Sequence, residues 1–134
     1  MKINNETDYA FRIMRELARK NQITDASTLA SETAIPQRFA LKILGKLVSG
    51  GLVISKKGAN GGYGLAKDAD KITLLDIVEI IDGPIVISKC LSGDLPCSHE
   101  TGKGSCDCFF NRVFDEINIT IAEKLRSVTV ADSV

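Results

Sequence analysis

The hydrophobic residues near the start of the chain recur with the spacing of a helix. Between Glu6 and Lys20 they return every three or four positions, which predicts an amphipathic helix that ends near Asn21. A short second helix is expected over residues 26–33, because Asp25 can cap its first amide groups. Both helices have an apolar face and therefore contribute to one core.

The pattern of residues 36–48 predicts a third helix. Pro36 suits its first turn, where a missing amide hydrogen costs nothing, and the glycines at 50 and 51 end it. Its apolar side is formed by Leu41, Ile43, Leu44, Leu47 and Val48. Three helices with a tight turn between the last two indicate a helix-turn-helix.

Two short apolar runs, residues 52–55 and 63–65, predict strands on either side of a glycine-rich tip at 56–62. A β-hairpin after a helix-turn-helix is the wing of a winged helix. Glycine runs also occur in phosphate-binding loops of nucleotide-binding proteins. This run lacks the Lys-Ser/Thr ending of such loops, and no helix follows it.

The acidic second half of the chain contains two further helical patterns, residues 73–82 and 109–127. The apolar stripe of the longer one consists of Phe109 or Phe110, Val113, Phe114, Ile117, Ile121 and Leu125. A long helix must bury such a stripe. Pairing with a second copy of the chain and packing on its own domain are both open, and each can apply to a different part of the helix.

The 134-residue chain has no net charge, but its two halves differ. Residues 1–67 carry eleven Lys and Arg against five Asp and Glu, a net charge of +6. Residues 68–134 carry six against twelve, a net charge of −6. A basic first half suggests contact with a polyanion, with the second half serving sensing or self-association. A chance partition of charge is the simpler alternative.

The third helix carries a candidate DNA-contacting surface. Arg38, Lys42 and Lys46 follow one another at four-residue steps and so line one exposed face. Such a face can lie along phosphates, or it can be a solvated lysine surface. Gln37, Arg38 and Phe39 stand at the helix N-terminus, the end that reaches base edges in the major groove. Arg can read guanine there, and Gln can read adenine.

The wing adds a second candidate contact. Lys56 and Lys57 stand on the glycine-rich tip, which can approach a DNA backbone closely or enter a minor groove. Neutralising several phosphates would make the binding dependent on salt. The candidate DNA-binding residues are Gln37, Arg38, Phe39, Lys42, Lys46, Lys56, Lys57, Gly58 and Asn60.

All four cysteines fall within nineteen residues, at Cys90, Cys97, Cys106 and Cys108. The glycines and Pro96 around them predict an irregular loop that cannot build a core. The C-x6-C-x8-C-x-C spacing suits an iron–sulfur cluster that is wrapped by a loop and followed by a helix. Zinc, whose thiol ligands usually come in C-x2-C pairs, and redox or structural thiols without a metal are the alternatives.

Several classes of protein are not expected. The first twenty residues are rich in charge and no apolar run approaches eighteen residues, so we expect a cytoplasmic protein with no membrane partner. A disulfide framework is not expected in that reducing compartment. One histidine and scattered acids offer no arrangement of nucleophile and base, so the chain is not expected to be an enzyme.

Four segments resemble the IscR and NsrR family of winged-helix regulators. They are residues 1–10, residues 34–39, residues 51–63 and the cysteine loop before an aromatic helix. The resemblance covers nearly the whole chain. It implies a homodimeric bacterial transcription factor that carries an iron–sulfur cluster, commonly 2Fe–2S, and changes its binding to double-stranded operator DNA with the state of the cluster. It also implies that DNA contacts include Arg38, Phe39, Lys57 and Gly58.

The resemblance also implies metal ligands. Members of this family usually have three cysteines, at somewhat shorter spacings than here. Alignment on the aromatic helix places Cys108 at the third ligand position, after Cys90 and Cys97. Cys106 is then a spare thiol or a fourth ligand.

Other candidates for the fourth ligand follow from the two branches of the family. The IscR branch has a histidine three residues after the last cysteine, but Asn111 stands there, and a carboxamide is a poor iron ligand. The NsrR branch uses an N-terminal aspartate of the other subunit, and Asp8 occupies the matching place. Asp8 can also be an ordinary acid near the positive end of a helix dipole. His99, the one histidine, is a further candidate or a solvated loop residue.

The expected fold is mainly α with a small β-hairpin, a winged helix-turn-helix plus a long C-terminal dimerisation helix. Residues 1–83 form the DNA-binding domain, residues 84–108 the cysteine loop that binds a cluster, and residues 109–134 the dimerisation helix and tail. The expected function is a transcriptional regulator that senses iron–sulfur, redox or nitric oxide status. The alternative is a metal-binding or thiol-redox protein whose winged helix binds another protein.

Overall fold

The computed structural model describes residues 2–93, 100–101, 105–106 and 108–134. Its α-helices are α1 (Asn5–Lys20), α2 (Ala26–Thr33), α3 (Gln37–Ser49), α4 (Leu74–Ile81), α5 (Lys89–Ser92) and α6 (Phe109–Arg126). Two 3-10 helices are η1 (Ala69–Lys71) and η2 (Val130–Ser133). Antiparallel pairs are formed by β1 (Val53–Lys56) with β2 (Gly62–Leu65), and by β3 (Glu100–Thr101) with β4 (Ser105–Cys106). The described part of the chain is mainly helical with a small wing, which confirms the predicted fold class.

Side-chain caps fix the starts of the first two helices, and a left-handed residue ends the first. Asn4 accepts a hydrogen bond from the Thr7 amide at 2.8 Å, and Asn21 ends α1 in the left-handed conformation with φ 49°. Asp25 accepts from the amide and the hydroxyl of Thr28, at 3.0 and 2.7 Å. These Thr28 hydrogen bonds hold the pKa of the Asp25 carboxyl below its usual value. The predicted starts of both helices therefore have a specific chemical cause.

One hydrophobic core joins α1, α2, α3, α4 and the tail that follows α6. Its largest fully buried side chains include Ile13, Met14, Leu17, Leu29, Ile43, Leu44, Leu47, Ile72, Ile77 and Val130. The tail is held by two backbone hydrogen bonds of 2.9 Å, from Val130 N to Ile72 O and from Leu74 N to Val128 O. The last residues of the chain thus complete the core of the winged helix.

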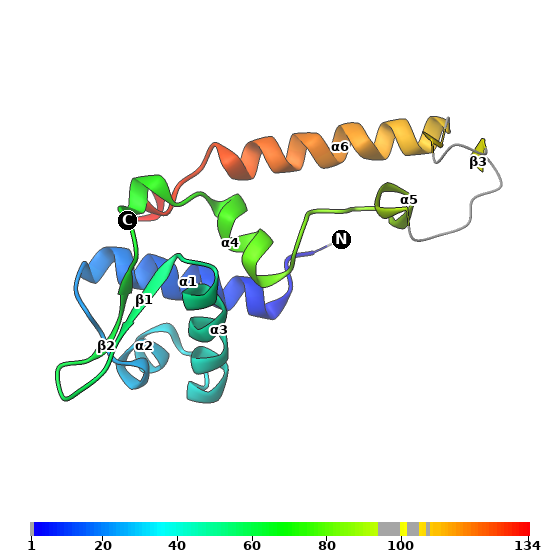
Figure 1. Ribbon diagram of the computed structural model, residues 1–134. Coiled ribbons are helices and arrows are strands. Elements are labelled where there is room, and N and C mark those ends of the chain that lie inside the picture. The colour runs from blue at the N-terminus through cyan, green and yellow to red at the C-terminus, as the bar shows by residue number, and fades with distance from the viewer. Residues whose placement is uncertain (1, 94–99, 102–104, 107) are drawn as a thin grey trace.

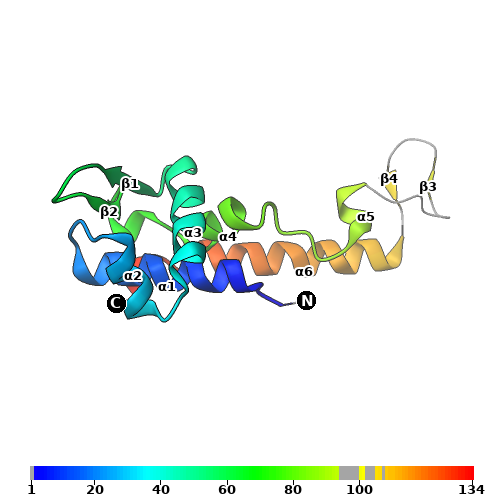
Figure 2. The ribbon, with the colours of Figure 1, turned by 90° about the horizontal axis from the view of Figure 1, so that it is seen from below.

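Helix α6 lies along one side of the molecule and extends beyond the winged helix (Figure 1). The view from below shows the same arrangement, with α5 beside the N-terminal half of α6 and the β3–β4 pair near the N-terminal end of α6 (Figure 2). The C-terminal half of α6 contacts α4. Among the described residues, no helix is long and apolar enough to cross a membrane.

Some residues of the apolar stripe predicted for α6 pack on the same chain, and others are exposed. Ile121 and Leu125 line a hollow with residues 83–87, the segment that leads from α4 toward the cysteines. Phe109, Phe110 and Ile117 remain 66%, 63% and 41% exposed. Part of the helix therefore packs on its own chain, and another part presents large apolar side chains to the surface.

Candidate functional site

Helix α3 has one face in the core and one face at the surface. Ala40, Ile43, Leu44 and Leu47 are buried. Leu41, predicted to lie on the apolar side, is 45% exposed, which corrects that prediction. The reason is helical geometry, because at 100° per residue Leu41 lies more than a quarter-turn from the centre of the buried side. The surface face of α3 is therefore broader than the sequence pattern suggests.

The start of α3 is braced against α1 by a series of stacked side chains. The Arg38 guanidinium lies over the Phe39 ring, 4.7 Å from its centroid, and the Phe39 ring lies 6.4 Å from that of Tyr9. Arg12 covers Tyr9 at 5.8 Å. Phe39 is half-buried by these contacts, whereas Gln37 and Arg38 are exposed. Gln37 and Arg38 are therefore open to solvent at the N-terminus of α3.

Two of the predicted DNA-contacting lysines have a partner within the chain. The Glu6 carboxylate on α1 accepts hydrogen bonds from Lys42 Nζ through Oε1 and from Lys46 Nζ through Oε2, the latter at 2.6 Å. The hydrogen bonds from Lys42 and Lys46 lower the pKa of Glu6 to about 2. No local pattern predicts this contact, because the partners lie 36 and 40 positions apart in the chain.

The wing is anchored at its base and exposed at its tip. Thr24 and Tyr63 exchange two backbone hydrogen bonds, at 2.9 and 2.8 Å, which join β2 to the loop before α2. Gly62 adopts φ +146°, and a Cβ there would lie 2.5 Å from the Thr24 carbonyl oxygen. Only glycine fits this close approach. The tip residues Lys56, Lys57, Gly58 and Asn60 are all exposed.

Two cysteines lie at the far end of the molecule, near the start of α6. Cys90 belongs to α5, and Cys108 is the N-cap residue of α6; both are free, half-buried thiols. Cys90 Sγ lies 3.1 Å from Ser88 Oγ. Hydrogen bonds from Ser88 and from Asn111, one turn after Cys108, lower the pKa of the Cys90 thiol. The structure therefore brings Cys90 to the first turn of α6.

The remaining candidate ligands are placed only in part. Cys97 and His99 lie outside the described residues, and for Cys106 only the backbone position in β4, opposite Glu100, is described. Within the described ranges, no group of three or more metal-ligating side chains comes together. Two soft thiol donors at one helix start fit an iron–sulfur group, and the loop between them carries the other two.

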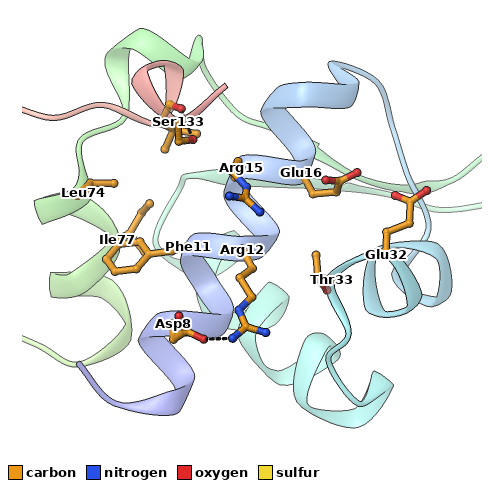
Figure 3. A pocket seen from close by; sticks show the side chains of 11 residues that line it. Asp8, Phe11, Arg12, Arg15, Glu16, Glu32, Thr33, Leu74, Ile77 and Ser133 are labelled. Carbon is orange, nitrogen blue, oxygen red and sulfur yellow. Dashed lines mark hydrogen bonds and ion pairs between the residues drawn. The ribbon is translucent and has the colours of Figure 1, made fainter. Parts of the chain in front are cut away.

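Asp8 lies on α1, where it forms an ion pair of 2.7 Å with Arg12. Figure 3 shows this pair at the edge of a pocket of about 580 Å³ between α1, α2, α4 and the C-terminal tail. The floor of the pocket is apolar and includes Phe11 and Ile77. Asp8 therefore lines this pocket. Within the described residues of the same chain, the Asp8 carboxylate pairs with the Arg12 guanidinium and not with a thiol.

The fold and the sequence both match known regulators. The profile of the Rrf2 family, described as iron-dependent transcriptional regulator, matches residues 3–134. The chain belongs to the Rrf2 family. Its named relatives are helix-turn-helix transcriptional regulators rather than enzymes, in agreement with the prediction of a transcriptional regulator. The resemblance drawn from the sequence is confirmed at the level of this family.

Individual Rrf2 relatives cover most of the chain. The regulator CymR of Bacillus subtilis is 33% identical over 75% of this chain and 74% of its own length. An rrf2-like regulator of Rhodobacter capsulatus is 31% identical over 97% of this chain and 90% of its own. A helix-turn-helix regulator of Mycobacterium tuberculosis is 36% identical over 75% of this chain, but the match spans only 65% of that protein's length.

Solved structures of the Rrf2 family have the same fold. CymR, described as the global cysteine regulator of B. subtilis, superimposes with a TM-score of 0.79 at 28% identity, over 98% of this chain and 95% of that one. IscR of T. potens superimposes with a TM-score of 0.76 at 22% identity, over 98% and 85%. At that identity the likeness to IscR concerns the fold alone.

Proposed function

We propose that this Rrf2 chain is a homodimeric bacterial transcriptional regulator that senses iron–sulfur, redox or nitric oxide status through a cluster held by its cysteine loop. The observation that carries the proposal is the placement of Cys90 beside the first turn of α6, where Cys108 is the N-cap residue. A thiolate at a helix N-terminus is favoured by the helix dipole. The family's description as iron-dependent supports the same assignment.

The residues that would hold a 2Fe–2S cluster are Cys90, Cys97 and Cys108, with Cys106, His99 or Asp8 of the partner subunit as the fourth ligand. When bound, such a cluster supplies thiolate-ligated iron whose charge and presence depend on redox state and iron supply. Ser88 and Asn111 would act as hydrogen-bond donors to the Cys90 sulfur, and such donors tune a cluster's potential. An oxygen ligand from Asp8 would make the site easier to lose.

The exposed side of α6 supports a dimer. Phe109, Phe110 and Ile117 form a large apolar surface along the half of α6 that extends beyond the winged helix. Such surfaces on a long helix are usually covered by another helix, and a two-fold axis would pair the same surface of a second copy. The dimer would carry two winged helices and so suit an operator with two half-sites.

The DNA interface would consist of the start of α3, the face of α3 that carries Lys42 and Lys46, and the wing. Gln37 and Arg38 are exposed at the N-terminus of α3, and the wing tip presents Lys56 and Lys57 next to Gly58 and Asn60, which are also exposed. Base edges would be read by the first pair and phosphates held by the second. Phe39 would act mainly by bracing Arg38, since its ring is already packed between Arg38 and Tyr9.

The proposal is tested by anaerobic purification followed by an absorption spectrum and by iron and sulfide analysis. We expect visible cluster bands with equal iron and acid-labile sulfide. Serine at Cys90, Cys97 or Cys108 should abolish these bands. Cys106→Ser and Asp8→Ala should differ from each other in their spectra, and the variant whose spectrum shifts or disappears identifies the fourth ligand. If Cys90→Ser kept full iron and sulfide with an unaltered spectrum, the cluster assignment would be wrong.

A regulator that uses bare thiols is the second candidate. The lowered pKa of Cys90 favours it, because the thiolate is the reactive form of cysteine. In that case the anaerobic protein would contain no iron or sulfide, and mild oxidation would produce a sulfenic acid or a disulfide detectable by mass. Zinc would be recognised by the same metal analysis.

A further inference from the structure

We propose that Glu6 is an internal competitor of DNA: it occupies Lys42 and Lys46 of α3 and thereby limits how strongly they hold a phosphate. This inference rests on the proposed contact of α3 with DNA. Its starting observation is that one carboxylate bridges two ammonium groups one helical turn apart, through separate oxygens. A phosphate group between the same lysines would use two oxygens in the same way.

The contact lies at the surface, where it can be exchanged. The side chain of Glu6 is 34% exposed, and those of Lys42 and Lys46 are 54% and 36% exposed. Ion pairs with this exposure are weak and are screened by salt. The three side chains therefore hold each other in the free protein without burying the lysines.

The lysines also remain accessible to a ligand. Lys42 and Lys46 lie on a shallow, open part of the surface, together with Gly45, Ser49 and Ile80. Gly45 leaves free space, since no atom lies within 4 Å of where its Cβ would be. A DNA backbone that lies on this surface would meet both ammonium groups and replace the Glu6 carboxylate.

Glu6 has two possible effects on DNA binding, and they have opposite signs. If the carboxylate competes, DNA must displace it, and its removal strengthens binding. If the carboxylate only orients the lysines, its removal weakens binding. Competition is the stronger expectation because Lys42 and Lys46 have no other ion-pair partner among the described residues, so their full charge becomes available.

The experiment measures binding of the full-length dimer to a fluorescein-labelled duplex of mixed sequence over a range of salt concentrations. Non-specific binding suffices, because it consists of phosphate neutralisation. Glu6→Gln should bind between about threefold and tenfold more tightly at low salt, as expected for the loss of two exposed ion pairs. In the wild type, DNA frees the Glu6 carboxylate, which then takes up a cation from the salt and offsets part of the counterion release. Glu6→Gln removes this uptake, so the slope of log affinity against log salt should steepen by up to about one unit.

The matched control is Glu32→Gln, which also removes one negative charge and one ion pair. Glu32 on α2 pairs with Lys20 on α1, with 2.9 Å between Oε1 and Nζ. It should change binding less than Glu6→Gln does. A second arm places Glu6→Gln in a Lys42→Met/Lys46→Met background, where the gain should vanish. Unchanged or weaker binding by a folded Glu6→Gln variant, or a gain that persists without the two lysines, would overturn the inference. Failure of the wild type itself to bind the duplex would instead overturn the proposed DNA contact.

Discussion

The backbone amide of Ile87 donates a hydrogen bond to the side-chain oxygen of Asn118, at 3.1 Å. This contact holds the chain that leaves α4 against the middle of α6, three residues before Cys90. It therefore sets where Cys90 arrives relative to the start of α6. We expect the position of Cys90 to depend on this contact, although Asn118 follows Cys108 by ten residues, nearly three turns of α6.

Asn118→Leu, which keeps the volume of the side chain but removes the acceptor, should loosen this path. An unpaired, partly buried amide costs about 1 kcal/mol or more. We expect faster loss of the cluster to an iron chelator, followed as decay of its visible absorption. Thr120→Ala, which changes an exposed neighbour on α6, should leave the rate unchanged. Equal rates for Asn118→Leu and the wild type would show that the contact has no role in the site.

Ile117 and Ile119 provide a matched pair for the proposed dimer. They are 41% and 48% exposed, yet helical geometry directs them to nearly opposite sides of α6. Ile117 shares its side with Phe110, so Ile117→Asp should produce monomers in analytical ultracentrifugation, whereas Ile119→Asp should remain dimeric. Ile121, by contrast, faces residues 83–87 of its own chain, so a charge there should lower stability instead. A dimeric Ile117→Asp variant would place the dimer surface elsewhere.

Lys57 at the wing tip should contribute one phosphate contact. Lys57→Ala is expected to flatten the slope of log affinity against log salt by about 0.9 units without changing the thermal midpoint. Lys71→Ala, an exposed lysine of η1 away from α3 and the wing tip, serves as the control and should not alter the slope. An unchanged slope for Lys57→Ala would remove this residue from the interface.

Gly62 and Gly45 should respond in opposite directions to alanine. At Gly62 the new Cβ would lie 2.5 Å from the Thr24 carbonyl oxygen at φ +146°, so Gly62→Ala should destabilise the fold by about 1–3 kcal/mol. At Gly45 the space is open and the backbone is helical, so Gly45→Ala should stabilise it by up to about 1 kcal/mol. Thermal unfolding of both variants checks the expectation, and a stabilised Gly62→Ala would contradict the described anchoring of the wing.

Local sequence signals predicted the elements whose ends have a chemical cause. The start of α4 is an example: Thr73 and Asp76 form the expected capping box, with hydrogen bonds of 2.9 and 3.1 Å. The left-handed end of α1 at Asn21 is another. The short helices α5 and η2 were not predicted, because four residues are too few to show a periodic pattern.

Contacts between distant residues were beyond the sequence. Val130 is buried in the core, although the residues around it were predicted only as a tail after the last helix. The pairing of Glu6 with Lys42 and Lys46 turns a row of exposed lysines into a bridged group, which spacing within α3 alone does not reveal. For the cysteines, spacing indicated a shared site, but only the fold shows that Cys90 meets Asn111 at the start of α6.

We propose that a cluster in the cysteine loop controls DNA binding, and one titration tests this dependence. An operator duplex is first selected from a random pool of duplexes. The affinity of the protein for this duplex is then measured anaerobically on preparations that differ in cluster content. Iron and sulfide are determined for each preparation. We predict that affinity changes in step with cluster content, and that Cys90→Ser remains at the value of the cluster-free wild type. Identical affinity at every cluster content would show that the cluster does not control DNA binding.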